Sequence, residues 1–88
     1  MANHPSALKR ARQSEKRRRS NLRHKTRVRS VVKAFRSALE TRDKARIQQT
    51  LQVAVRVIDR AAQRGVLKGN TASRTVSRLT IAANRAAA

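Results

Sequence analysis

The 88-residue sequence has no cysteine, tryptophan or tyrosine, and Phe35 is its only aromatic residue. Without cysteine, neither a disulfide nor a thiolate metal site can form. Small secreted domains usually depend on disulfides, so this composition favours a reducing cytoplasm. Proteins that read unpaired bases normally stack them on aromatic rings. Any nucleic-acid binding is therefore expected to use phosphates and backbone shape, not splayed bases.

Glycine and proline are also scarce, with only Pro5, Gly65 and Gly69. Few breaks and no alternating β-branched pattern favour long helices over strands. No apolar run approaches the roughly 18 residues of a membrane span. The first residues lack the apolar region of a secretory signal. We therefore expect a soluble intracellular protein with no membrane partner.

Acidic residues are few, and their positions offer no catalytic pair. The four acids face 23 lysines and arginines, which gives a net charge of +19 and a pI near 12.0. Glu15, Glu40, Asp43 and Asp59 are not spaced for acid–base chemistry. The two histidines are far apart in sequence, and no glycine-rich phosphate loop is present. We expect no enzyme activity, no metal, no cofactor and no small-molecule substrate.

Three amphipathic helices are predicted. The first runs from Ser6, as its cap, to Thr41, with an apolar stripe from Val28 onward. The second is capped by Asp43 and closed by Gly65, and its wide apolar arc suits a middle helix with two neighbours. The third is capped by Asn70 or Thr71. Its inner stripe is Ala72, Val76, Leu79, Ala83 and Ala86, with Ile81 exposed.

These helices predict an all-α, three-helix antiparallel bundle in a single domain, residues 1–88. Residues 28–88 form the bundle, and residues 1–27, which we call the basic arm, continue helix one beyond the core. Residues 1–29 hold eleven lysines and arginines and one acid, a net charge of +10. Such self-repulsion needs a polyanionic partner. We expect residues 1 to about 25 to be largely disordered in the free protein and helical on a polyanion.

The cations of the densest stretch surround every side of the predicted helix. They are Lys16, Arg17, Arg18, Arg19, Arg23, Lys25, Arg27 and Arg29. A flat duplex contacts one side of a helix, whereas an arm between several RNA helices needs cations all round. The pattern therefore favours folded RNA. His24 fits as a further donor.

Basic helices also occur in other classes of protein. A membrane-surface helix needs an apolar face that the arm lacks, and a leucine-zipper DNA binder needs a longer seam than the one after Val28. A solubility tail is disfavoured because the arm joins a core helix without a flexible joint. A nucleoid-type DNA-compacting protein and a regulator of acidic proteins stay open.

Three stretches carry a family resemblance: MANHPSALKRARQSEKRRRSN at the start, DKARIQQTLQ at 43–52 and IDRAAQRGVLKGNTASRTVSRLT at 58–80. The matching positions are Ser6, Lys9, Arg10, Gln13, Ser14, Glu15, Lys16, Arg18, Asn21, Asp59, Arg60, Ala62, Gly65, Lys68, Asn70, Ala72 and Arg74. In order and spacing they resemble the bacterial small-subunit ribosomal protein S20 family over nearly the whole chain.

The resemblance implies a cytoplasmic ribosomal protein whose first helix inserts among helices of the small-subunit ribosomal RNA. It implies binding to the 5′ domain of that RNA and a role in subunit assembly, with other small-subunit components open as partners. Carried over by position, the RNA contacts are Ser6, Lys9, Arg10, Arg12, Gln13, Ser14, Lys16, Arg17, Arg18, Asn21, His24, Lys25 and Arg29. A second contact falls on Lys68, Asn70 and Arg74. Arg19, Arg23, Arg27 and Arg78 complete the candidate set.

Overall fold

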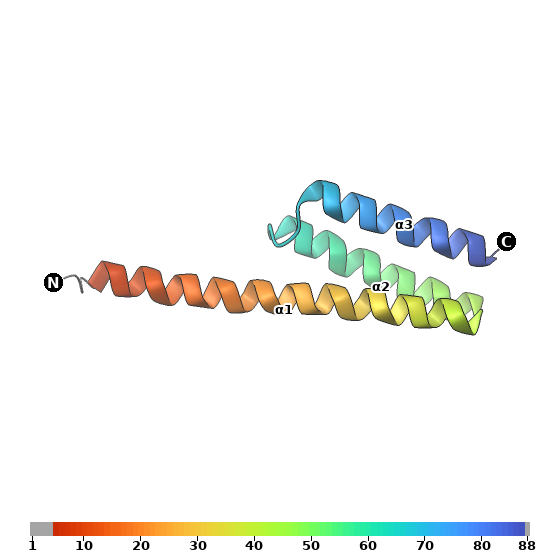
Figure 1. Cartoon of the computed structure of the whole chain (residues 1–88), viewed down its shortest axis with the longest axis horizontal. Helices are drawn as coiled ribbons and strands as arrows, with labels where there is room; N and C mark the ends of the chain where they lie inside the picture. Colours follow the sequence, from red (N-terminus) through yellow and green to blue (C-terminus); the bar gives the residue numbers. More distant parts are fainter. Residues whose placement is uncertain (1–4, 88) are drawn as a thin grey trace.

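The structure, a computed structural model, describes residues 5–87 as three α-helices. They are α1 (Pro5–Thr41), α2 (Lys44–Gln63) and α3 (Gly69–Ala87), and successive helices run antiparallel (Figure 1). The described residues contain no strand. The all-α prediction with a long first helix is confirmed.

Helix α2 lies between the other two helices and packs against both, while α1 and α3 scarcely meet. The wide apolar arc predicted for α2 is therefore explained by its two packing partners. The fold is a flattened, elongated bundle, with extents of 66 × 22 × 14 Å. Its radius of gyration is 17.7 Å, against about 12 Å for a compact chain of this length. The N-terminal half of α1 accounts for the difference, because it projects beyond α2 and α3 (Figure 1).

Helix α1 differs from its prediction at the start. It begins at Pro5, so Ser6 lies inside the first turn and is not the cap. Proline suits the first turn because its fixed φ is helical and its missing N–H would have no partner there. The structure also does not show the disorder expected of the arm, since α1 is one uninterrupted helix of 37 residues. Its arm half is rich in strong helix formers and has no internal glycine or proline.

The turn before α2 follows the prediction. The side chain of Asp43 accepts hydrogen bonds from the backbone N–H of Ala45 (3.1 Å) and of Arg46 (3.5 Å), which confirms it as the N-cap. Gly65 has φ of 75°, in the left-handed region where glycine carries no steric penalty. The predicted end of α2 is therefore confirmed as well.

The start of α3 was predicted wrongly. The helix begins at Gly69, and the carbonyl of Lys68 accepts its first hydrogen bond from the N–H of Ala72 (3.0 Å). Asn70 and Thr71 thus lie within the first turn, and neither is the cap. Glycine is a weak helix former, but one weak residue in a first turn is outweighed by the packing of the turns that follow.

The core lies where the three helices overlap. Phe35 and Ile58 are fully buried, and Ile47 and Leu79 are the other large buried side chains. On α1 the side chains packed against this core begin at Val28, as predicted. Ala86 is exposed, contrary to prediction, because α3 packs on essentially one neighbour and its buried stripe is narrow. Ile81 is 49% exposed, as expected.

Candidate nucleic-acid interface

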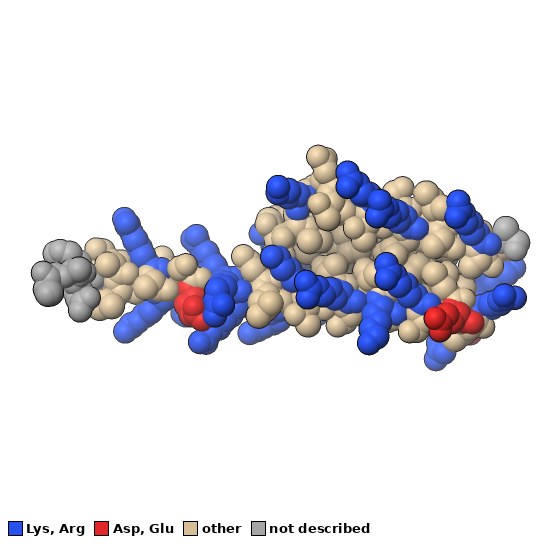
Figure 2. All heavy atoms as spheres, in the orientation of Figure 1, with Lys and Arg blue, Asp and Glu red and all other residues tan. Residues whose placement is uncertain are grey.

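The basic arm presents its predicted contact residues to solvent along one helix. From Ser6 to Arg29 they extend over about 35 Å at 1.5 Å per residue. All of the candidate residues in this stretch are exposed except His24, which is partly buried. Figure 2 shows lysine and arginine side chains leaving the arm on opposite sides. The cations of the arm therefore project from at least two opposite sides of the helix.

Glu15 places one carboxylate among the cations of the arm. An oxygen of Glu15 accepts hydrogen bonds from Arg18 Nη2 (3.2 Å) and Arg19 Nε (3.3 Å). The hydrogen bond and the charge of Arg18 hold the pKa of Glu15 below its ordinary value of 4.5, and the pair raises the pKa of Arg18. Within residues 5–87, Glu15–Arg18 and Glu15–Arg19 are the two ion pairs with an N–O distance below 4.0 Å. The other arm cations have no internal counter-charge at that distance.

The Glu15 pair predicts acid-sensitive helicity in the arm. Because the pKa is lowered in the helix, the pair stabilises the helix fully above pH 4.5 and loses this effect as the pH falls through the lowered pKa. Circular dichroism of the free protein between pH 7 and pH 3 should show helix loss that is smaller in E15Q. E40Q is the matched control, since Glu40 has no ion pair within 4.0 Å in the described structure. Equal acid loss in E15Q and the unaltered protein would contradict the assignment.

The second predicted contact lies on another part of the fold. Lys68, Asn70, Arg74 and Arg78 are all exposed, in the turn after α2 and on α3. The α2–α3 connection lies at the end of the bundle from which the arm projects (Figure 1). Arg78 sits midway along α3, which α2 separates from α1. The fold therefore does not gather all predicted contacts on one surface.

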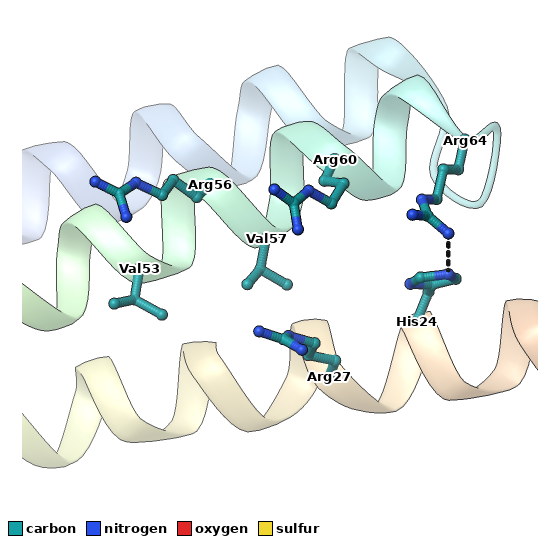
Figure 3. A pocket seen from close by; sticks show the side chains of 7 residues that line it. All are labelled: His24, Arg27, Val53, Arg56, Val57, Arg60 and Arg64. Atoms are coloured by element: carbon teal, nitrogen blue, oxygen red, sulfur yellow. Dashed lines mark hydrogen bonds between the residues drawn. The ribbon is translucent and has the colours of Figure 1, made fainter.

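The structure also shows a groove between α1 and α2 that the sequence analysis did not select. It encloses about 450 Å³ and is lined by His24, Arg27, Val53, Arg56, Val57, Arg60 and Arg64. We call it the arginine groove. Val53 and Val57 point from α2 toward α1, with the guanidinium groups of Arg27, Arg56 and Arg60 around them (Figure 3). The available signal was the four-residue spacing from Arg56 to Arg64, which places these arginines on one side of a helix.

A hydrogen bond of 3.1 Å joins Arg64 Nη1 to His24 Nε2 across this groove (Figure 3). A guanidinium only donates, so Nε2 is the acceptor of this hydrogen bond. His24 thus has a partner within the protein, and its predicted contact with RNA stays a prediction. The bond links the root of the arm to the last turn of α2.

Other functional centres have no support in the described residues. Across residues 5–87, no three histidine, aspartate or glutamate side chains are grouped closely enough to hold a metal ion. None of the three described helices has a stretch long and apolar enough to cross a membrane. The candidate interface consists of the cationic surface of α1, the arginine groove and the separate patch of Lys68, Asn70, Arg74 and Arg78.

Comparisons with known proteins give a consistent result. A family model described as Ribosomal protein S20 matches residues 2–84. The small ribosomal subunit protein bS20 of Nitratidesulfovibrio vulgaris is 54% identical over 44 residues, which are 50% of this chain and 51% of that protein. The bS20 protein of Maridesulfovibrio salexigens is 58% identical over 43 residues, 49% of each chain. That of Helicobacter pylori is 47% identical over 49 residues, 56% of this chain and 55% of its own. The chain thus spans about half the length of the curated relatives it matches.

Proposed function

The chain belongs to the ribosomal protein S20 family, and on that premise we propose that it is a structural constituent of the small ribosomal subunit that binds the small-subunit ribosomal RNA. The proposed role is not enzymatic. All three relatives above are bacterial proteins named small ribosomal subunit protein bS20, which supports a place in the bacterial cytoplasmic ribosome. The family match also argues against a DNA-compacting protein.

The observation that carries the proposal is the arm itself: cations exposed on several sides of a continuous helix that the core holds by one end. A guanidinium forms two parallel hydrogen bonds with a phosphate, so arginines are suited to an RNA backbone. A rod with cations on all sides can satisfy phosphates from more than one RNA helix at once. Neutralisation by these phosphates removes the self-repulsion of the arm.

In this proposal residues 1–27 are the RNA-binding arm and residues 28–88 the bundle that aims it. The RNA segment is the 5′ domain, as the family resemblance implies. The contacts are the candidate residues of the arm, with Lys68, Asn70, Arg74 and Arg78 as a separate patch. Base-specific contacts are not needed, because phosphates and sugars supply the binding energy and the folded shape of the RNA supplies the specificity.

A competition titration across a salt series tests the proposed function. The competitors are a transcript of the small-subunit 5′ domain, an unrelated folded RNA and a duplex DNA of equal length. If about eight phosphates are neutralised, log K should fall against log salt with a slope of about −6 to −7. The ribosomal transcript should remain preferred as the salt concentration rises, because shape recognition is less sensitive to salt than charge attraction.

Two results would contradict the proposal. Equal affinity for all three nucleic acids would indicate a general polyanion binder and bring back the DNA-compacting alternative. Little affinity for any of them would indicate an acidic protein partner. Strong binding with a slope of log K against log salt near zero would contradict the electrostatic mechanism, but not RNA binding itself.

A further inference from the structure

We propose that the arginine groove is a second phosphate site, which takes backbone phosphates of the bound RNA between α1 and α2. The identity of the ligand as RNA rests on the proposed function. The site itself rests on different residues, Arg56 and Arg60 of α2 and Arg64 at its C-cap, none of which is among the RNA contacts predicted from the sequence.

The groove carries a concentrated positive charge. Four guanidinium groups line the groove, and no carboxylate is among its lining residues. Among residues 5–87, the ion pairs within 4.0 Å are formed by Glu15, in the arm. In the described residues the arginines of the groove therefore have no carboxylate within 4.0 Å, and they repel one another. A phosphodiester between the two helices would accept hydrogen bonds from several of them at once.

The shape of the groove also suits a phosphate. Val53 is 47% exposed and, with Val57, forms an apolar floor between the two helices. An apolar surface beside the guanidiniums lowers the local dielectric, so a phosphate held there interacts more strongly than one on an open helix face. The groove volume of about 450 Å³ is far more than the roughly 30 Å³ of one water molecule.

The contact between Arg64 and His24 orients one of the arginines of the groove. This hydrogen bond of 3.1 Å holds the Arg64 guanidinium across the groove, over the root of the arm. Less side-chain freedom is then lost when a phosphate binds, which favours binding. A phosphate bridging Arg27 of α1 and Arg60 of α2 would also fix the arm relative to the bundle. The groove therefore acts on the orientation of the arm as well as on affinity.

The test compares three variants that each lose three positive charges. The groove variant is R56Q/R60Q/R64Q and the control is R36Q/R46Q/R85Q, whose side chains are exposed and lie outside the groove. The arm variant is R12Q/R17Q/K25Q. Glutamine is close to arginine and lysine in helix propensity, so all three should fold, and circular dichroism checks this. The groove variant should lose about a hundredfold in affinity for the 5′ domain transcript, with a salt slope flatter by two to three units. The control should change less than about threefold.

A single-cysteine crosslink gives a second readout, which the absence of native cysteine allows. A thiol-linked photo-crosslinker on V53C should attach to the RNA several-fold more efficiently than the same reagent on S37C, at an exposed position of α1 outside the groove and outside the proposed contacts. The groove proposal would be overturned if the groove variant bound RNA like the control, or if both positions crosslinked equally. The proposed function would still stand in that case, provided that the arm variant lost affinity for RNA. If all three variants bound RNA like the unaltered chain, the proposed function itself would fail.

Discussion

Phe35→Ala should leave the bundle largely unfolded at 25 °C. Phe35 is fully buried, and few other large side chains fill the core. Truncating a buried phenylalanine costs about 3–5 kcal/mol, through lost burial and the cavity that remains. A single core of this size supplies only about 3–5 kcal/mol of unfolding free energy in total. Urea titration followed by circular dichroism, without RNA, should therefore show no cooperative transition in the variant.

Leu22→Ala is the matched control for that experiment. Leu22 is 61% exposed in the arm, so its removal should change the unfolding free energy by less than about 0.5 kcal/mol. RNA must be absent in both measurements, because a ligand of the native state would stabilise the protein by mass action. A Phe35 variant with the same urea midpoint as the unaltered protein would show that the core does not depend on this ring.

The arm variant R12Q/R17Q/K25Q should lose at least about a hundredfold in affinity for the ribosomal transcript at moderate salt. At about 100° per residue its three positions lie on well-separated sides of α1, and all three side chains are exposed. Each lost phosphate contact flattens the plot of log K against log salt by about one unit. The slope of this variant should thus be less steep by about three units.

The three single substitutions R12Q, R17Q and K25Q test whether RNA surrounds the arm. If phosphates approach from all sides, each substitution should flatten the salt dependence by about one unit. If only one substitution has an effect, one face of the arm contacts RNA and the all-round arrangement is wrong. The control R36Q/R46Q/R85Q removes the same charge as the triple variant, so it separates loss of contacts from loss of net charge.

The helices and the core could be predicted because they depend on local patterns. The stripe from Val28 to Leu39 repeats with the helical period, and Phe35 within it is buried. Asp43 and Gly65 have the roles that their residue types favour at helix ends. The errors at Ser6 and at the start of α3 lie at helix ends, where one hydrogen bond decides the boundary.

The arginine groove could not be predicted because it depends on how two helices align. The spacing of Arg56, Arg60 and Arg64 shows that they share a side of α2, but not that this side borders α1. Arg27 and His24 join them only through the register of the α1–α2 hairpin. Nothing near His24 in the sequence indicates its hydrogen bond to Arg64, forty residues away.

The position of α2 between α1 and α3 has a consequence for how the chain folds. Each packed interface joins helices that follow one another along the chain, and the first and last helices scarcely meet. Native contacts are therefore made over short loops, at little cost in chain entropy. Helical proteins dominated by such local contacts fold in microseconds to milliseconds. The bundle can thus form by two successive hairpin closures, without waiting for a long-range search between its ends.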